Sequence, residues 1–304
     1  MVKKGNIIIV ILLVVAAFLG GSAIAKRKYG GQEGLGSKGT KETPTTEQIP
    51  TPLPFAPKKS AKPEVKFFVM SFCPYGNQSE AGLEPVYQLL KDKVSWVPKY
   101  IINDKKSSCE QSCPFKVYND DAKTRCDAAV KNGEIKDLET CKGYFPYTSA
   151  DECLKKECAE LKAGEYESLH GVQELNQNIR EICAFNLGNL EKWWKFVIGI
   201  NNKCTAQNAD TCWKDQATAA GLDLAKITQC FKSQFKALAV KEIEEAAKYQ
   251  ASGSPTVFIN ETLYNGGRAP EDYKKAICAS FENPPEECNK VLGQGSVATG
   301  GGCQ

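Results

Sequence analysis

The sequence predicts an α/β fold in which a helical, cysteine-rich insertion separates the two halves of one sheet. An apolar run leads into a turn and a helix at Cys73, and two further short strand patterns appear only near the end, at residues 256–264. Between them, at about residues 103–250, the spacing of apolar residues is mostly helical or absent. A strand, a helix and a strand, then a long excursion, then two strands and a helix together indicate an α/β plan.

The stretch VKFFVMSFCPYGNQ, at residues 65–78, organises this plan. Its apolar run, bounded by turn residues, predicts a strand buried on both faces. Pro74 fits the first turn of a helix, so Cys73 is expected at a helix N-terminus, where partial positive charge stabilises a thiolate. We therefore expect Cys73 to be a catalytic nucleophile rather than a small buried apolar residue. Gly76 stands where a C-x-x-C motif would have its second cysteine.

Composition narrows the class of protein. The net charge of +3 over 304 residues gives no indication of a nucleic-acid partner. Fourteen cysteines indicate either disulfides in an oxidising compartment or metal ligands. Because His170 is the single histidine, most zinc sites and histidine-base chemistries are excluded. We expect no metal and no organic cofactor.

The N-terminus has the pattern of an export segment. Two lysines precede an apolar stretch, and residues 7–25 are barely long enough to cross a bilayer as an anchor. The alternative is a signal peptide cleaved near Ala25. Both predict an extracytoplasmic protein, and we favour the membrane anchor. Residues 26–63 are rich in Gly, Thr, Ser, Pro and Lys and predict a flexible linker, or a disordered N-terminus if the leader is cleaved.

Residues 64–285 are expected to form the folded domain. Val94–Ile101 predicts a second strand, at an edge of the sheet because Pro98 cannot donate a ladder hydrogen bond. Residues 103–164 carry six cysteines and little apolar periodicity, so cross-links must supply stability there, and we favour disulfides over metal. Apolar spacing then predicts helices at residues 78–91, 166–187, 190–200, 211–220, 224–235, 237–249 and 270–281, and strands at 256–259 and 262–264. Cys278 and Cys288 flank a short loop and are expected to pair, and residues 286–304 read as a flexible tail.

Two motifs resemble a known fold. Cys73-Pro74-Tyr75-Gly76 after a strand, and Gly253-Ser254-Pro255-Thr256 before another, resemble the thioredoxin fold and its DsbA-like branch, which carries a helical insertion. The resemblance implies a cis peptide bond before Pro255, placed beside the reactive cysteine, where the backbone receives an extended substrate strand. It therefore implies that Pro74, Tyr75, Ser254 and Pro255 bind substrate.

A third motif lies in the insertion. His170, Gly171, Glu174, Asn178 and Cys183 have the spacing H-G-x2-E-x3-N-x4-C, which is similar to the signature of the gamma-interferon-inducible lysosomal thiol reductase family. Two cysteines of that signature are replaced here, by Ser168 and Leu175. We expect His170 to have a structural role, packed beside Leu169 and Val172 on a helix, rather than to act as a catalytic base.

These patterns predict an extracytoplasmic thiol–disulfide oxidoreductase or isomerase that acts on protein disulfides through Cys73. Its expected partners are exported cysteine-containing proteins or a thiol–disulfide redox partner. Gly76 cannot release a substrate, which leaves three alternatives: an external thiol resolves the mixed disulfide, another cysteine of the chain does so, or the fold is a redox-inactive peptide-binding or chaperone-like module. Since thirteen cysteines remain beside Cys73, they cannot all pair internally, so either a second thiol is free or Cys73 has a partner. Cys303, on a glycine-rich tail that could reach many surfaces, is our candidate for a reversible partner and resolving thiol.

Overall fold

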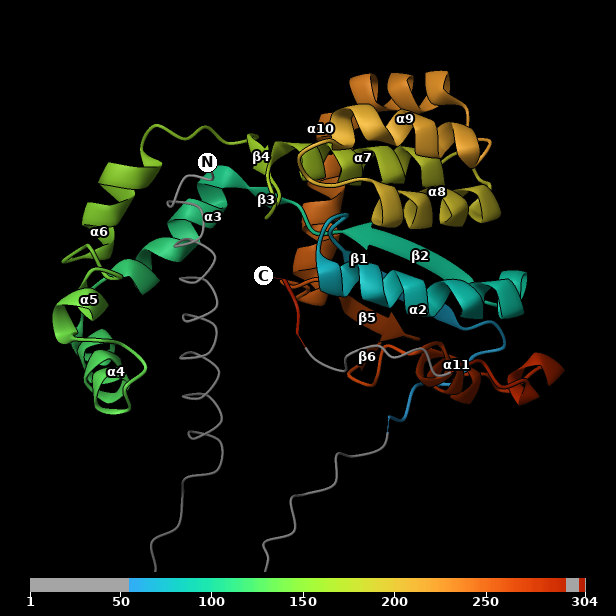
Figure 1. The fold of residues 1–304 in the computed structure, drawn as a ribbon, viewed down its shortest axis with the longest axis horizontal. Coiled ribbons are helices and arrows are strands. Elements are labelled where there is room, and N and C mark those ends of the chain that lie inside the picture. The colour runs from blue at the N-terminus through green and yellow to red at the C-terminus, as the bar shows by residue number, and fades with distance from the viewer. Residues whose placement is uncertain (1–54, 294–300, 304) are drawn as a thin grey trace, which may run out of the picture. The chain divides into compact units, whose positions relative to one another are not determined.

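The computed structural model describes residues 55–293 and 301–303 (Figure 1). The expected leader at residues 7–25 and most of the expected linker lie outside these residues. The chain divides into two compact units: a smaller one at Cys109–Glu160, and a larger one made of Pro52–Ser108 and Leu161–Gln304. Within the described ranges, no helix combines the length and the apolar character needed to cross a bilayer.

A four-stranded sheet lies at the centre of the larger unit. Its strands are β1 (Glu64–Val69), β2 (Ser95–Tyr100), β5 (Thr256–Ile259) and β6 (Thr262–Tyr264), in the order β2-β1-β5-β6. β1 runs parallel to β2 and antiparallel to β5, and β6 is the hairpin partner of β5. β2 is an edge strand, as Pro98 predicted. This mixed sheet, assembled from strands on either side of a helical insertion, is the thioredoxin-like α/β fold expected from the sequence.

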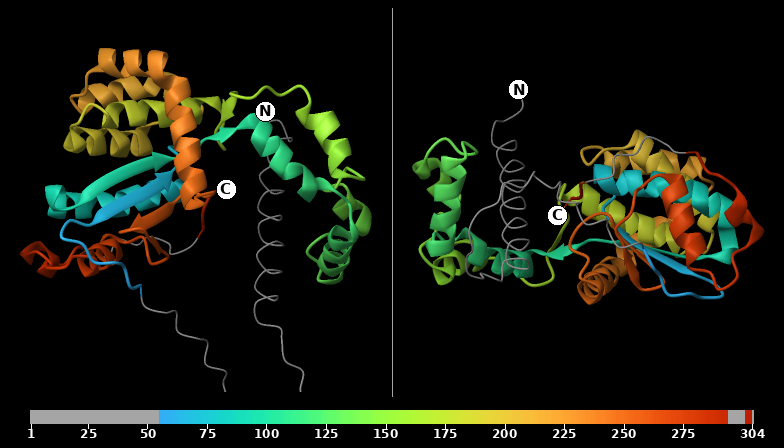
Figure 2. Two further views of the ribbon diagram at one scale, coloured as in Figure 1. Left: turned by 180° about the vertical axis from the view of Figure 1, so that it is seen from behind. Right: turned by 90° about the horizontal axis from the view of Figure 1, so that it is seen from below.

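The central strand β1 is buried on both faces because its side chains alternate between two helical layers. On one face Phe67 stacks on the fully buried Trp194 of α8 (Leu190–Lys203), with ring centroids 5.7 Å apart. The same apolar cluster includes residues of α2 (Pro74–Leu90) and α11 (Pro270–Ala279). On the other face Phe68 packs against Tyr249 of α10 (Leu224–Tyr249), which crosses the sheet in the left view of Figure 2.

The insertion within the larger unit is a two-stranded ribbon followed by four helices. The ribbon pairs β3 (Asn103–Asp104) with β4 (Tyr166–Glu167), and the helices are α7 (Val172–Phe185), α8, α9 (Ala209–Ala219) and α10. Disulfides join Cys183 to Cys230, between α7 and α10, and Cys204 to Cys212, between the end of α8 and α9. The expected Cys278–Cys288 pair is also present and links α11 to the short helix η4 (Glu286–Asn289).

Two boundaries in the insertion differ from the sequence prediction. The helices expected at 224–235 and 237–249 are one continuous helix, α10, because no glycine or proline interrupts the sequence between them. The helix expected from residue 166 begins instead at Val172, since β4 occupies the first residues and Gly171 has a φ of 101°. Leu169 and Val172, expected on the packed face, are 38% and 66% exposed.

The smaller unit is stabilised by disulfides, as expected. It contains the end of α3 (Lys105–Ser112), then α4 (Asp120–Lys131), α5 (Leu138–Lys142) and α6 (Ala150–Cys153), and the short helical turns η2 (Cys113–Lys116) and η3 (Leu154–Cys158). Its bridges are Cys109–Cys158, Cys113–Cys153 and Cys126–Cys141. The helices form here despite weak apolar periodicity, because asparagine, aspartate and serine side chains at residues 119, 137 and 149 cap them.

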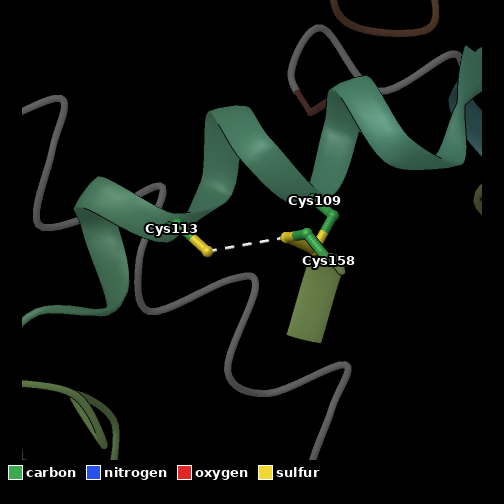
Figure 3. A group of neighbouring side chains, drawn as sticks. All are labelled: Cys109, Cys113 and Cys158. Atoms are coloured by element: carbon green, nitrogen blue, oxygen red, sulfur yellow. Dashed lines mark hydrogen bonds between the residues drawn. A yellow bond between two sulfur atoms is a disulfide. The ribbon is translucent and has the colours of Figure 1, made fainter. Parts of the chain in front are cut away.

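Two of these bridges lie side by side. The sulfur of Cys113 is 3.7 Å from that of Cys158, and together with Cys109 they form a group of sulfurs within 4.8 Å of one another (Figure 3). Each sulfur already belongs to a disulfide. A metal ligand must be a thiolate, so this oxidised cluster acts as a cross-link between the ends of the unit.

Two carboxyl groups meet inside the core of the larger unit. Glu80 on α2 and Glu181 on α7 are fully buried. Glu80 accepts a hydrogen bond of 2.7 Å from Asn201, and Glu181 accepts one of 2.9 Å from Gln177. Burial raises the pKa of Glu181 to about 7, and burial together with the charge of Glu181 raises the pKa of Glu80 well above its usual range. The folded protein therefore favours the protonated pair at mildly acidic pH.

This pair predicts a pH-dependent stability. A raised folded-state pKa contributes stability that is complete below the unfolded pKa of about 4.3 and is lost as pH rises through about 7. From pH 5 to pH 8 the free energy of unfolding should therefore fall, by on the order of 3 kcal/mol, and Glu181→Gln should remove much of this fall. Urea unfolding across that range measures it.

The control is Glu244→Gln, at an exposed position of α10. It should leave the pH dependence as it is in the native chain. Parallel pH profiles for the native chain and Glu181→Gln would contradict the assignment.

Candidate active site

Cys73 caps the N-terminus of α2. Its backbone N–H donates to the Met70 carbonyl at 3.1 Å, which turns the chain from β1 into the helix, and Pro74 occupies the first helical turn. The N–H of Gly76 points at the Cys73 sulfur from 3.4 Å. The sulfur thus lies at the positive end of a 17-residue helix and is fully buried. This is the position in which a thiolate is stabilised, as the sequence predicted.

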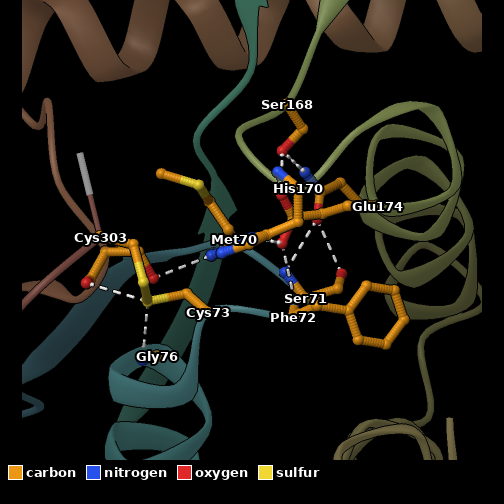
Figure 4. Close-up of polar contacts among 11 residues, drawn as sticks. Met70, Ser71, Phe72, Cys73, Gly76, Ser168, His170, Glu174 and Cys303 are labelled. Atoms are coloured by element: carbon orange, nitrogen blue, oxygen red, sulfur yellow. Dashed lines mark hydrogen bonds and ion pairs between the residues drawn. A yellow bond between two sulfur atoms is a disulfide. The ribbon is translucent and has the colours of Figure 1, made fainter. Parts of the chain in front are cut away.

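Cys73 is joined to Cys303 by a disulfide, with Cα atoms 6.0 Å apart and 230 residues between them in sequence (Figure 4). The pairing that the odd cysteine count indicated is therefore present. With it, the fourteen cysteines form seven disulfides and none is free.

The tail and the proline loop form a short antiparallel bridge. The Ser254–Pro255 peptide bond is cis, as the resemblance implied. Ser254 N–H donates to the Cys303 carbonyl at 2.7 Å, and Cys303 N–H donates to the Ser254 carbonyl at 2.8 Å. The Ser254 carbonyl oxygen also lies 3.3 Å from the Cys73 sulfur. The end of the chain thus lies where the DsbA-like resemblance places a substrate strand.

Because Gly76 has no side chain, the Ser254 side chain of the cis-proline loop fits beside it. The Ser254 hydroxyl accepts a hydrogen bond of 3.0 Å from the N–H of Met70. A Cβ atom on Gly76 would lie 2.5 Å from that hydroxyl oxygen and 3.3 Å from the Met70 carbonyl oxygen. A cysteine at position 76 would therefore displace the Ser254 side chain, and the second sulfur reaches Cys73 from the tail instead.

Arg268 lies at the entrance of the site and was not predicted from the sequence. Pro74 is exposed, and Tyr75 is half-buried between the tail and Arg268. The guanidinium of Arg268 lies 5.4 Å from the centre of the Tyr75 ring and donates to the carbonyl of Gly301. A single arginine in a glycine-containing loop carries no motif, so only the structure identifies it. Beside the tail, Pro255 lines a groove of about 510 Å³.

The insertion supports the backbone just before Cys73. Glu174 Oε1 accepts from the N–H of Phe72 at 2.9 Å (Figure 4). Asn178 Oδ1 accepts from the N–H and the hydroxyl of Ser71 at 3.0 and 2.7 Å. Asn178 in turn donates to Ser168 at 3.2 Å. The glutamate and asparagine of the H-G-x2-E-x3-N motif are therefore positioning residues for the Cys73 loop. The sequence showed both residues only as members of a known motif, and their role follows from the contacts in the structure.

His170 belongs to the same network. Its Nδ1 lies 2.7 Å from Glu174 Oε1, and Glu174 Oε2 accepts from the His170 N–H and the Ser168 hydroxyl at 2.9 and 2.7 Å. The hydrogen bond to Glu174 raises the pKa of His170. Burial alone would raise the pKa of Glu174, but the bonds from His170 and Ser168 lower it below its usual range. His170 orients Glu174 from the loop before α7, not from a helix as the sequence suggested.

Replacement of Glu174 tests this support. Glu174→Gln keeps the shape of the side chain but replaces one of its two accepting oxygens with an NH2 group. The donors are the Phe72 N–H on one oxygen and the Ser168 hydroxyl and His170 N–H on the other, so at least one of them is left without an acceptor. We expect the free energy of unfolding to fall by about 1–3 kcal/mol and the pKa of His170 to fall toward its ordinary value. Urea unfolding and proton NMR of the single histidine measure the two effects. Glu282→Gln, at an exposed position, is the control, and equal stability of the two variants would contradict the assignment.

Comparisons with known proteins give two kinds of match. Residues 149–278 match the vacuolar sorting receptor thioredoxin-like domain. Vacuolar-sorting receptor 7 of Arabidopsis thaliana is 23% identical over 211 residues, which cover 55% of this chain and 33% of that protein. The chain therefore spans about a third of the length of this curated relative.

Solved structures of disulfide oxidoreductases are among the structural matches. Reduced DsbG from Mycobacterium tuberculosis is 14% identical with a TM-score of 0.43, covering 75% of this chain and 82% of that one. DsbA from Chlamydia trachomatis is 9% identical with a TM-score of 0.38, covering 77% and 93%. A putative protein disulfide isomerase from Nitrosomonas europaea is 14% identical with a TM-score of 0.39, covering 71% and 96%. At these low identities and TM-scores the matches assign no chemistry to this site, so any activity has to be argued from the site's own geometry.

Proposed function

We propose that the chain is a thiol–disulfide oxidoreductase whose redox couple is Cys73 with Cys303. The observation that carries the proposal is the Cys73–Cys303 disulfide, formed between a helix N-terminus and a tail that is paired with the cis-proline loop. Of the three alternatives that Gly76 leaves open, this supports resolution by another cysteine of the chain. No metal or organic cofactor takes part in such an exchange.

In the reducing direction, the Cys73 thiolate attacks one sulfur of a substrate disulfide and the other substrate sulfur leaves as a thiolate. The Cys303 thiolate then attacks the Cys73 sulfur of the mixed disulfide, which forms the Cys73–Cys303 bond and releases the second substrate thiolate. Two electrons pass to the substrate, whose two thiolates take up protons from solvent. An external dithiol restores the reduced couple by the same exchange, and substrate oxidation is the reverse.

The loop at Ser254 couples resolution to release. Because the tail pairs with both the N–H and the carbonyl of Ser254, a substrate strand bound to the same groups must leave when Cys303 returns. The Gly76 N–H, 3.4 Å from the Cys73 sulfur, stabilises the thiolate that attacks the substrate and that leaves again when the external dithiol attacks the Cys303 sulfur of the oxidised couple.

The compartment and partners follow as part of the proposal. Seven disulfides in one chain favour an oxidising, extracytoplasmic environment. Residues 7–25 would anchor the chain to a membrane, or would be removed near Ala25. The substrates would then be exported cysteine-containing proteins or a redox partner. The likeness of the His170 motif to the gamma-interferon-inducible thiol reductases adds support for thiol chemistry.

The second candidate is a redox-inactive peptide-binding module. Its supporting observation is that Cys73 is fully buried in its disulfide, with Cys303 only 9% exposed. In that case the tail is a permanent cross-link, and the groove beside Pro255 binds extended segments without exchange.

An insulin-reduction assay separates the two candidates. We expect the native chain to turn over and Cys73→Ser to fall to the uncatalysed rate. Cys303→Ser should accumulate a mixed disulfide with insulin, visible by intact mass, and should depend on added small thiol for release. The paired variant Cys278→Ser/Cys288→Ser is the control, because it removes a disulfide away from the site. Uncatalysed rates for all four proteins would support the binding module.

A further inference from the structure

We propose that Tyr75 and Arg268 form a subsite that selects glycine two positions before the substrate cysteine. This inference rests on the proposed function and adds a specificity to it. The natural occupant of the subsite in this structure is Gly301, in the tail sequence Gly301-Gly302-Cys303. The proposed substrate is therefore an extended segment with the pattern Gly-x-Cys.

Cys303 sets the register of the tail in the site. Its sulfur is bonded to Cys73, and its N–H and carbonyl are both bonded to Ser254. A substrate cysteine that forms the same bond to Cys73 and pairs with the same backbone groups will lie in the same register. The residue two positions before that cysteine then lies where Gly301 lies in the tail.

Three features restrict that position to glycine. The φ of Gly301 is 95°, a region that L-residues with a side chain rarely adopt. A Cβ atom there would lie 2.4 Å from Cε1 and from Cζ of Tyr75. The Tyr75 ring is held by the Arg268 guanidinium, 5.4 Å from its centre, and the same guanidinium donates to the Gly301 carbonyl. Tyr75 thus excludes a side chain, while Arg268 binds the backbone.

The intervening position is less restricted. A Cβ atom on Gly302 would lie 3.3 Å from the Ser254 carbonyl oxygen, a close approach that a shift of a few tenths of an ångström relieves. Selection is therefore expected at the second residue before the cysteine and only weakly at the first.

Peptide exchange tests the selection directly. The full chain carrying Cys303→Ser is equilibrated in glutathione buffer with acetyl-Gly-Gly-Cys-amide or acetyl-Ala-Gly-Cys-amide, and the Cys73 adducts are quantified by intact mass. The remaining tail competes equally with both peptides. We expect the glycine peptide to be preferred about tenfold, or about 1.4 kcal/mol.

Two variants separate the roles within the subsite. Adding Tyr75→Ala should reduce the preference to about fivefold, since only the backbone restriction at positive φ, about 1 kcal/mol, then remains. Adding Arg268→Met should weaken both adducts, because the carbonyl contact is common to both peptides, and should lower the glycine preference less than Tyr75→Ala does, because the ring stays but loses the guanidinium beside it. Equal adduct levels for the two peptides with Tyr75 in place would overturn the inference.

A readout within the chain needs no external peptide. Gly301→Ala should shift the equilibrium between the Cys73–Cys303 disulfide and glutathione about tenfold toward the reduced form, and Tyr75→Ala should partly restore it. Gly293→Ala is the matched control, because nothing lies within 4 Å of the added methyl group. If Cys73 forms no adduct with either peptide, the proposed function fails and the inference with it. If adducts form without a glycine preference, only the inference fails.

Discussion

The pairing of Ser254 with Cys303 is the constraint on which the site depends. The backbone of Ser254 pairs with Cys303 in the tail, and its carbonyl oxygen lies 3.3 Å from the Cys73 sulfur. Its hydroxyl accepts a hydrogen bond from the N–H of Met70. One residue of the cis-proline loop therefore positions both sulfurs and the end of β1. The glutamate–asparagine pair of α7 fixes the same segment from the other side, so the Cys73 loop is held between the two halves of the fold.

This arrangement gives a physical account of the missing second cysteine. Gly76 is small because the Ser254 hydroxyl occupies the space that a side chain at that position would need. The second sulfur is instead carried on the tail, which pairs with the loop as an added strand. In the proposed couple, the same backbone groups of Ser254 would serve for resolution and for substrate binding. Under this proposal, substrate capture and release would compete for one backbone edge, which a second cysteine on the helix would not require.

Local patterns predicted much of this fold. The bounds of β5 and β6, the buried strand β1 and the position of Cys73 at a helix N-terminus all follow from short-range rules of hydrophobicity and capping. The odd number of remaining cysteines indicated a partner for Cys73 or a second free thiol, and the glycine-rich tail made Cys303 the candidate. What could not be predicted depends on packing between distant segments: the pairing among the four cysteines at 109, 113, 153 and 158, the role of Arg268, and the donors that converge on Glu174. The break expected within α10 was wrong because no residue there ends a helix.

The central claim is that Cys73–Cys303 is a reversible couple while the other six disulfides are structural. Titration of the full chain against glutathione buffers of increasing reducing strength, with maleimide trapping and peptide mass mapping, tests it most directly. We expect Cys73 and Cys303 to become labelled together, while the remaining twelve cysteines are still oxidised and the fold is intact. Labelling of this pair only together with the structural cysteines, as the protein unfolds, would contradict it.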